Sequence, residues 1–459
     1  MTFDRWNPPP GRKALVAGAA RSGVAAARLL ARHGADVTLC DRRATDALSE
    51  ATRALAADGV TVTGGRDDAG LLDGRDLLVW SPGIPVDHAL IVAARERGIP
   101  VMGELELGFL AAKAPLLCIT GTNGKSTTTD LTGALLRAAG REVEVCGNIG
   151  RAICEVAEDV SDSGLLVVEV SSFQLETVEK LKPWVSTWLN LTPDHLDRHG
   201  DLETYAAMKD RLFVRQDESD WAVRNADDPA VASRRAGHGA PLEFSPTRPV
   251  PEGAYFEDGH LVTAWRGGRE RLMPRSEVRL PGPHNLANVL AALTTVMPLE
   301  LPPEVLRATL REYGGLEHRL EPAGSVGGVR FVNDSKATNT NSLEVALQSF
   351  PEKIVLIAGG RDKGQDFSPL APLVRQACRQ VVLIGEGAPA MEQAWTGVPA
   401  VRAESLREAV EMAYLAARPD GVVLLSPGCS SYDMFKDLED RGRRFKDEVA
   451  RLAQGGART

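Results

Sequence analysis

Short runs of aliphatic and β-branched residues alternate along the chain with stretches of helical periodicity. The runs lie at residues 14–17, 37–40, 77–80, 116–120, 165–168, 354–358, 381–384 and 422–425. Alternation of this kind is typical of α/β layers built on parallel sheets. Because such sheets bind ligands beyond the carboxyl ends of their strands, we expect the chemistry of this chain in the residues that follow the runs.

The chain is too long for a single hydrophobic core. Its 459 residues are 43% hydrophobic and 25% charged, which is enough apolar material for a core in each of several domains. The alternation breaks near residues 103–115 and near residues 313–315, and the Pro/Gly-rich stretch 217–281 is interpreted as peripheral strands of the middle domain. We predict three domains, at residues 1–104, 105–315 and 316–459.

Charge and cysteine usage exclude several classes of protein. The net charge of −9 comes from interspersed Asp and Glu, which argues against a nucleic-acid or membrane-surface partner. The six cysteines lie far apart without a C-x-x-C pair, so we expect buried, reduced thiols. The first ten residues have no signal-peptide pattern, and no run reaches the roughly 18 apolar residues of a membrane helix. We expect a cytoplasmic protein.

The clearest motif is Gly-Thr-Asn-Gly-Lys-Ser-Thr at residues 121–127, which follows an apolar run and leads into a helical pattern. A strand, a glycine loop and a helix start form a cradle for an anion. Gly121 and Gly124 allow backbone N–H groups to face phosphate oxygens, Lys125 adds a mobile positive charge, and the Ser126 hydroxyl can reach Mg²⁺. The spacing is shorter than that of the eight-residue P-loop, and a simple glycine-rich turn is the alternative interpretation.

Two further polar residues follow β-rich runs and suit a metal site. Glu169 ends the run 165–168, and Mg²⁺ prefers carboxylates together with phosphates. His195 comes shortly after the run 185–189 and is either a metal ligand or a hydrogen-bond donor behind the ligands. Taken alone, the glutamate would be a solvated or capping residue and the histidine a structural one.

The N-terminal pattern is typical of a dinucleotide-binding unit, with a strand, the sequence Gly-Ala-Ala-Arg-Ser-Gly at residues 18–23, a helix and a second strand. Ala20 occupies the second glycine position of G-x-G-x-x-G, where a methyl group would approach a diphosphate. The imperfect fingerprint is weak evidence for NAD. The same framework can hold a nucleotide sugar.

Four residues near the carboxyl end suit a dicarboxylic amino acid, because a carboxylate needs charge-assisted partners. They follow apolar strands and are Lys336, Thr338, Lys363 and Ser431. Alone, Lys363 would be interpreted as a solvated loop lysine.

These motifs resemble those of the Mur ligase superfamily, which comprises the ATP-dependent amide ligases of peptidoglycan precursor synthesis together with folylpolyglutamate synthases. The loop at residues 121–127 resembles their shared nucleotide loop. Further similarity lies, in chain order, at residues 148–150, 169–176, 282–288, 318–319, 333–339 and 426–431. These stretches look most like the branch that adds D-glutamate, and the Asp-Asn-Pro-Arg signature of a meso-diaminopimelate-adding relative is absent from the sequence.

The resemblance implies a Rossmann-like N-terminal domain, a central P-loop-type ATPase domain with a parallel sheet, and a C-terminal Rossmann-like α/β domain, in a monomer. It implies ATP and Mg²⁺ as cofactors and the joining of D-glutamate to UDP-N-acetylmuramoyl-L-alanine through an acyl phosphate. A sibling Mur ligase or a folylpolyglutamate synthase taking another amino acid is the first alternative. A dinucleotide-binding oxidoreductase or a nucleotide sensor is the second, and it leaves the phosphate loop unexplained.

The same resemblance assigns site residues. For ATP it implies Gly121, Thr122, Asn123, Gly124, Lys125, Ser126, Thr127, Asn285, Asn288, Arg319 and Asp334. For the UDP-sugar it implies Arg21, Ser22, Asp41, Arg42, Arg43, Ser81 and Asn148. In the amino-acid site, Leu438 stands where the family has an aromatic residue. Lys209, which by itself would be a helix-surface lysine, is implied to be carbamylated, to hold Mg²⁺ with Ser126, Glu169 and His195, and to form the catalytic set with Lys125, Glu169 and His195.

Overall fold

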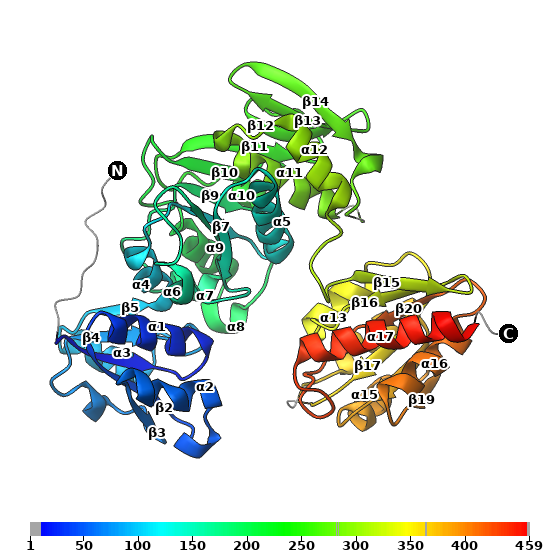
Figure 1. Cartoon of the computed structure of the whole chain (residues 1–459), viewed down its shortest axis with the longest axis horizontal. Coiled ribbons are helices and arrows are strands. Elements are labelled where there is room, and N and C mark those ends of the chain that lie inside the picture. The colour runs from blue at the N-terminus through cyan, green and yellow to red at the C-terminus, as the bar shows by residue number, and fades with distance from the viewer. Residues whose placement is uncertain (1–10, 281, 283, 363–364, 457–459) are drawn as a thin grey trace. The chain divides into compact units, whose positions relative to one another are not determined.

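The computed structural model describes residues 11–280, 282, 284–362 and 365–456. The chain folds into two compact units, Met1–Tyr313 and Gly314–Thr459. In the described part of the chain the strands form three sheets, two in the first unit and one in the second (Figure 1). The mainly parallel α/β architecture that the sequence predicts is confirmed.

The N-terminal sheet is parallel throughout, in the order β3-β2-β1-β4-β5. Its strands are β1 (Lys13–Ala17), β2 (Asp36–Asp41), β3 (Thr61–Gly64), β4 (Leu77–Trp80) and β5 (Val101–Gly103), and its helices are α1 (Arg21–Arg32), α2 (Glu50–Arg53) and α3 (Ala89–Glu96). The central strands β1 and β4 are buried on both faces, which accounts for their unbroken apolar runs.

The central sheet has the order β14-β13-β12-β11-β10-β9-β6-β8-β7, and its last three strands in the chain pair antiparallel. Its strands are β6 (Leu116–Thr120), β7 (Val143–Gly147), β8 (Leu165–Glu169), β9 (Val185–Trp188), β10 (Trp221–Asn225), β11 (Ala240–Ser245), β12 (Gly253–Glu257), β13 (His260–Trp265) and β14 (Gly268–Pro274). The described part of the stretch 217–281 therefore extends this sheet at its edge, which confirms the predicted peripheral strands.

Helices cover both faces of the central sheet (Figure 1). One apolar core lies under α5 (Lys125–Ala138), α11 (His284–Val296) and α12 (Pro303–Glu312). The other lies under α4 (Glu104–Ala111), α6 (Ile153–Val156), α7 (Ser172–Leu175), α9 (Leu202–Asp210) and α10 (Pro229–Ala232), and the short α8 (Leu196–His199) packs beside α9. The carboxyl ends of β6, β8 and β9 are thereby left at one edge.

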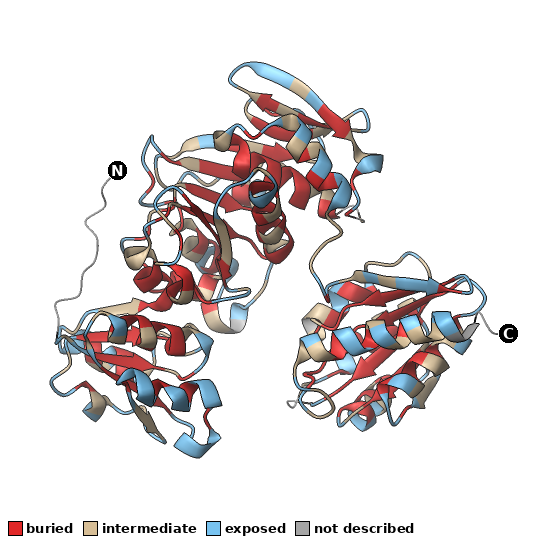
Figure 2. Ribbon diagram, in the orientation of Figure 1, coloured by how far each residue is buried: buried red, intermediate tan, exposed pale blue. Residues whose placement is uncertain are grey.

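The two sheets of the first unit share a hydrophobic core. Leu107 of α4 and Cys154 of α6 pack in one cluster with Val16 of β1 and Leu29 of α1 (Figure 2 shows this buried layer in red). Burial of shared apolar surface holds the N-terminal and central sheets together.

The sheet of the second unit has the order β15-β16-β20-β17-β18-β19, with only β15 antiparallel among its described strands. Its strands are β15 (Glu321–Val326), β16 (Val329–Asn333), β17 (Ile354–Gly359), β18 (Cys378–Ile384), β19 (Ala400–Arg402) and β20 (Val422–Leu425). Its helices are α13 (Thr340–Leu347), α14 (Ala371–Ala377), α15 (Ala388–Ala394), α16 (Leu406–Ala417) and α17 (Leu438–Gly456), over two cores.

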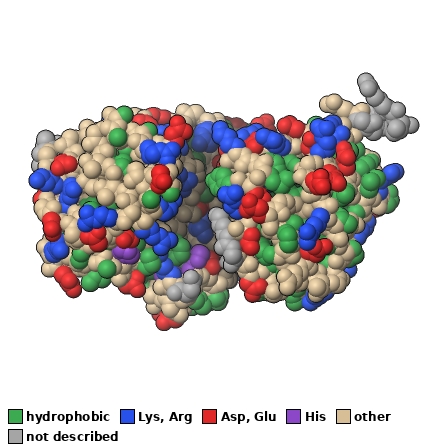
Figure 3. Space-filling view, turned by 90° about the horizontal axis from the view of Figure 1, so that it is seen from below, with side chains coloured by type: hydrophobic (Ala, Val, Ile, Leu, Met, Phe, Trp, Pro, Cys, Tyr) green, Lys and Arg blue, Asp and Glu red, His purple; other side chains and the backbone are tan. Residues whose placement is uncertain are grey.

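The cysteines and the surface charges are placed as the sequence composition predicts. All six cysteines are buried and free, which confirms the expected reduced thiols. Acidic and basic side chains are interspersed over the face drawn in Figure 3. Among the described residues, none of the helices has both the length and the apolar character to cross a membrane.

Candidate nucleotide and metal site

The glycine loop has the backbone geometry that its sequence requires. It joins β6 to α5, and Gly121 (φ 155°) and Gly124 (φ 83°) adopt conformations that favour glycine. A Cβ on Gly124 would lie 2.2 Å from Oδ1 of Asn288. Lys125 is the first residue of α5, so the loop ends at a helix N-terminus whose N–H groups favour an anion.

Polar side chains hold this loop in shape. Lys125 Nζ donates hydrogen bonds to the carbonyl oxygens of Gly121 (2.9 Å) and Thr122 (2.7 Å). Asn190 Oδ1 accepts from the N–H groups of Thr122 (3.1 Å) and Asn123 (2.8 Å), and its Nδ2 donates to the Asn123 carbonyl (3.0 Å). Asn190 follows β9 and is not among the residues selected from the sequence, although it lies just beyond a strand end.

The two asparagines of α11 lie next to the loop. Asn288 Nδ2 donates to Asn285 Oδ1 (2.8 Å), and Thr128 of α5 donates to Asn288 Oδ1 (3.4 Å). Helix α11 packs along α5. The structure therefore brings Asn285 and Asn288 to the phosphate loop from 160 residues away in the chain.

Glu169 is a buried acid rather than the solvated or capping residue that its sequence position alone suggests. It pairs in register with Ile119 of β6, and only 1% of the residue is exposed. Its Oε1 accepts from Asn148 Nδ2 (2.6 Å), whereas its Oε2 is buried without a hydrogen-bond partner among the described residues. A buried carboxylate oxygen left unpaired is costly, so this atom points to a cation that would satisfy it.

Lys209 is also buried, which rules out the helix-surface lysine that its sequence position alone would suggest. The residue is 1% exposed, its Nζ donates to the Gly121 carbonyl (3.0 Å), and it lies 4.4 Å from the centre of the Tyr205 ring. Burial, and then the nearby Lys125 charge, lower the pKa of Lys209 well below its usual value. The neutral amine is therefore favoured more strongly than in a solvated lysine.

His195 lies between α7, which follows Glu169, and α9, which carries Lys209. Its backbone is left-handed (φ 53°), its ring centre is 4.7 Å from that of Phe173, and it meets the Tyr205 ring edge-on at 6.4 Å. Its Nε2 lies 3.5 Å from Asp194 Oδ2. A half-exposed imidazole in this place can serve either interpretation drawn from the sequence.

The carboxyl ends of β1, β2 and β4 meet in the N-terminal sheet. Asp41 accepts from the Ala19 N–H (2.8 Å) and from Arg43, whose guanidinium lowers the pKa of Asp41 to about 2. Ser81 Oγ donates to the Gly18 carbonyl (3.2 Å). Ala20 has φ −89° and an exposed side chain, so its position requires no glycine. Ser22 is the second residue of α1, and Arg42 is exposed beyond β2.

Arg21 makes its contacts outside the N-terminal sheet. Its guanidinium donates to the carbonyls of Gly147 (3.2 Å), Asn148 (3.1 Å) and Gly150, in the turn after β7 of the central sheet. The resemblance implies a UDP-sugar contact for Arg21, and in the structure its partners are backbone carbonyls of the central sheet.

In the second unit, Asp334 follows β16 and is almost fully buried. Its carboxylate accepts from the Leu320 N–H (3.2 Å) and from Ser426 Oγ (2.7 Å), and burial raises its pKa to about 7. Arg319 is exposed between two residues with left-handed backbone, His318 (φ 64°) and Leu320 (φ 44°). The turn thus presents the arginine outward beside Asp334.

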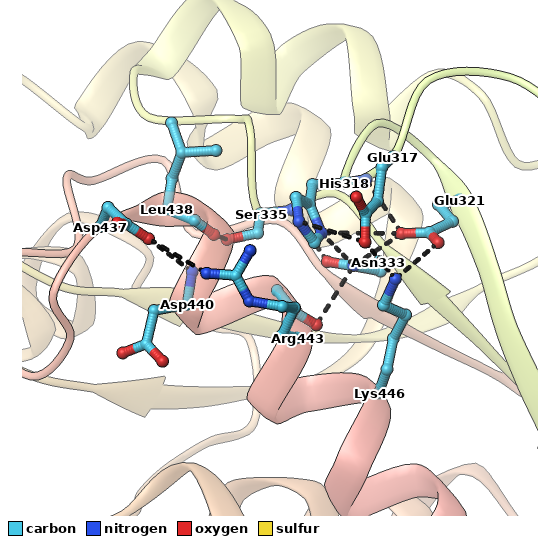
Figure 4. Close-up of polar contacts among 11 residues, drawn as sticks. Glu317, His318, Glu321, Asn333, Ser335, Asp437, Leu438, Asp440, Arg443 and Lys446 are labelled. Carbon is cyan, nitrogen blue, oxygen red and sulfur yellow. Dashed lines mark hydrogen bonds and ion pairs between the residues drawn. The ribbon is translucent and has the colours of Figure 1, made fainter.

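A cluster of acids and histidine anchors this turn (Figure 4). Glu317, His318 and Glu321 lie close enough to share a metal ion, but Lys446 Nζ donates to Glu317 Oε1 (2.6 Å) and Glu321 Oε1 (2.9 Å). Asn333 Nδ2 contacts both His318 Nδ1 and Glu321 Oε2 at 2.9 Å. The Lys446 ammonium bridges the two carboxylates where a metal ion would otherwise lie, so the cluster is interpreted as structural.

A buried arginine lies beside the segments that carry the described residues of the expected amino-acid site. Lys336 and Thr338 are half-buried after β16, Ser431 is buried after β20, and Leu438 begins α17. Lys363 lies outside the described residues. Arg441, 0% exposed, donates to Oγ and O of Ser335 (both 2.9 Å) and to the Cys429 carbonyl (3.1 Å). Arg441 thus joins the segment after β16 to the segment after β20. The sequence pattern of its helix does not predict that it is buried.

Comparison with known proteins identifies the family. The chain is 43% identical to the UDP-N-acetylmuramoylalanine–D-glutamate ligase of Acidobacterium capsulatum over 97% of both chains. It is 42% identical to the enzyme of the same name from Pelotomaculum thermopropionicum, over 97% of this chain and 98% of the relative. The chain belongs to the Mur ligase family. Models of the Mur ligase MurD-like N-terminal domain, the Mur ligase middle domain and the Mur ligase glutamate ligase domain match residues 12–103, 119–296 and 318–429.

Solved Mur ligases share the fold of this Mur ligase. UDP-N-acetylmuramate-alanine ligase MurC from Thermotoga maritima matches with a TM-score of 0.58 at 18% identity, over 96% of this chain and 99% of that chain. MurF ligase from the same organism, in complex with ADP, matches with a TM-score of 0.56 at 16% identity, over 91% and 96%. The three-domain α/β fold and the resemblance drawn from the motifs are both confirmed.

Proposed function

We propose that this Mur ligase joins D-glutamate to UDP-N-acetylmuramoyl-L-alanine in peptidoglycan precursor synthesis, with cleavage of ATP to ADP and phosphate. The observation that carries the proposal is the glycine loop at the N-terminus of α5, with Lys125 folded over it. Next to it in the sheet lies Glu169, whose Oε2 has no hydrogen-bond partner within the described part of the chain. The names of the relatives supply the substrate pair, and the ADP of the MurF structure supports use of ATP.

The triphosphate is assigned to the loop and the adjoining helix. Backbone N–H groups of residues 121–127 and the Lys125 ammonium would neutralise its charge, with Asn285 and Asn288 beside them. Arg319 and Asp334 of the second unit are proposed to contact the same nucleotide. Phosphoryl transfer depends mainly on positioning and charge neutralisation, which suits a site assembled from several loops.

The residues around the loop fit Mg²⁺. Glu169 offers a buried carboxylate oxygen, and Ser126 and His195 offer a hydroxyl and an imidazole. The ion would neutralise phosphate charge at this place. Lys209 is proposed to gain a carbamate: its neutral amine adds to CO₂, and loss of one proton leaves an anion. The lowered pKa of Lys209 supports this step, because only the unprotonated amine reacts.

The reaction is proposed to run in two displacements. A carboxylate oxygen of the acceptor attacks the γ-phosphorus and ADP leaves, which gives an acyl phosphate. The amino nitrogen of D-glutamate then attacks the acyl carbon, phosphate leaves with that oxygen, and loss of a proton leaves an amide. Lys125 supplies positive charge to the phosphoryl group in the first step.

The UDP-sugar is assigned mainly to the N-terminal sheet and D-glutamate to the second unit. For the UDP-sugar we propose Arg21, Ser22, Asp41, Arg42, Arg43, Ser81 and Asn148, and for D-glutamate Lys336, Thr338, Lys363, Ser431 and Leu438. We retain the domain boundaries at residues 104/105 and 315/316 as a proposal, together with a cytoplasmic monomer. A half-buried leucine at 438 would pack on the aliphatic part of glutamate where an aromatic residue does so in the family.

Phosphate release tests this assignment. Purified protein is incubated with ATP, Mg²⁺ and UDP-N-acetylmuramoyl-L-alanine, and single amino acids are added in turn. We expect rapid release only with D-glutamate, and far less with L-glutamate or without acceptor. A preference for another amino acid would favour a sibling ligase, and release that is indifferent to amino acids would refute the proposal.

A further inference from the structure

Among the described residues, the Glu169 carboxylate accepts a hydrogen bond through one of its two oxygens, and the donor is the side-chain amide of Asn148. The Asn148 Nδ2 donates to Oε1 at 2.6 Å, while Oε2 is buried without a partner among the described residues. A short hydrogen bond to a carboxylate fixes the rotation of the carboxylate plane. The side chain of Asn148 therefore determines where the unpaired oxygen points.

Asn148 is itself fixed by the backbone of the same strands. Its N–H donates to the Glu169 carbonyl at 2.9 Å, and Gly147 pairs in register with Glu169 across β7 and β8. Gly147 has φ 101°, and a Cβ there would lie 2.4 Å from the Glu169 carbonyl oxygen. This close approach brings the asparagine amide next to the acid that it orients.

The turn that carries Asn148 is bound to the N-terminal sheet by Arg21. The guanidinium, at the first residue of α1, donates to three carbonyls of residues 147–150. A second arginine reaches from the central domain to the N-terminal one. Arg198 of α8 donates to the carbonyls of Pro82 (3.2 Å) and Ile84 (2.9 Å), which follow β4. With the shared core, these contacts make the turn a rigid support.

We infer that Asn148 is a positioning residue, which orients Glu169 toward the cation of the proposed function while Arg21 holds its turn in place from the N-terminal sheet. The inference rests on the proposed function, since it takes Glu169 as the acid that meets Mg²⁺. It adds a second role to the UDP-sugar contact proposed above for Asn148, because here the asparagine acts through Glu169. Residues behind metal ligands commonly change metal affinity by about 10- to 100-fold when removed.

Binding of Mn²⁺, as a spectroscopic substitute for Mg²⁺, tests the inference without turnover. In the presence of ADP, electron paramagnetic resonance measures free Mn²⁺ and so gives the dissociation constant. We expect Asn148→Ala to weaken Mn²⁺ binding by about tenfold, and Asn148→Gln, which keeps an amide donor, to recover part of the loss. Because Asn148 is exposed, the melting temperatures of both variants should stay near that of the wild type.

Matched controls separate this effect from general loosening. Asn225→Ala removes an asparagine bond to a backbone carbonyl (Leu189, 2.8 Å) in the same sheet, and should leave Mn²⁺ affinity unchanged. Arg21→Leu should weaken Mn²⁺ binding. Arg28 lies on the same helix as Arg21 and forms an exposed ion pair with Asp58, and Arg28→Leu should leave Mn²⁺ binding unchanged.

The outcomes distinguish the inference from the function on which it rests. Wild-type Mn²⁺ affinity in Asn148→Ala, with only the KM for the UDP-sugar raised, would make Asn148 a substrate contact and overturn the inference alone. A wild-type protein that binds no Mn²⁺ with ADP overturns the proposed metal site and the inference together.

Discussion

Replacing Gly124 by alanine tests the geometry of the phosphate loop. The residue has φ 83°, and an added Cβ would lie 2.2 Å from Asn288 Oδ1 and 3.1 Å from its Cγ. The left-handed backbone costs an L-residue roughly 1–2 kcal/mol. Asn288 is buried and bonded to Asn285 and Thr128, so it cannot move aside easily, and overpacking of this kind costs about 1–3 kcal/mol more.

Gly140 provides the matched control at the other end of α5. Its φ is 73°, and an added Cβ would meet nothing within 4 Å. Gly140→Ala therefore carries the backbone strain without the clash. We expect Gly124→Ala to lose roughly 1–3 kcal/mol more of unfolding free energy than the control in urea. We also expect it to bind ATP at least tenfold more weakly, which corresponds to about 1.4 kcal/mol.

Calorimetric titration with Mg·ATP and urea unfolding monitored by circular dichroism measure the two quantities. If Gly124→Ala matched Gly140→Ala in both stability and ATP affinity, the loop would not depend on close packing against Asn288, and the reasoning would be refuted.

Three further predictions follow from charge and burial. Lys125→Ala should lower kcat by orders of magnitude with little change in circular dichroism, and near-wild-type phosphate release would contradict its role in charge neutralisation. Burial raises the pKa of Asp334 from 3.8 to about 7, so the wild type should lose stability as pH rises from about 4 to 7. Asp334→Asn should flatten this decline, measured as melting temperature against pH. Parallel curves for the variant and the wild type would contradict it. Arg441→Leu should cost about 1–3 kcal/mol in urea unfolding for each buried carbonyl that loses its donor, at Ser335 and at Cys429. A total loss under about 1 kcal/mol would refute this.

Strands buried on both faces were predictable with close bounds, whereas some strands toward sheet edges were missed. The runs at residues 116–120 and 422–425 correspond to β6 and β20 with the same bounds. β3 and β7 were missed, because they lie toward the edges of their sheets and are only partly buried, with polar residues among them. Continuous apolar runs require burial on both faces, so the sequence signal fades where one face is open.

The local part of the candidate site was also predictable. The loop at residues 121–127 and Glu169 follow strands, and their chemistry depends on nearby sequence. The partners that hold them come from distant segments, as with Asn190 on the loop or Arg21 on the turn after β7. One sequence has no information on such pairs. Lys209 and Arg441 show the same limit, because a charged residue on a helix is expected in solvent and tertiary packing decides otherwise.

The central claim is that the γ-phosphoryl group of ATP moves onto a carboxylate of the acceptor before the amide forms. UDP-N-acetylmuramoyl-L-alanine labelled with oxygen-18 in its free carboxylate tests this claim directly, with ATP, Mg²⁺ and D-glutamate present and the released phosphate analysed by mass spectrometry. The account predicts one labelled oxygen atom in each phosphate, in equal amount to the amide product. Unlabelled phosphate accompanying amide formation would contradict it.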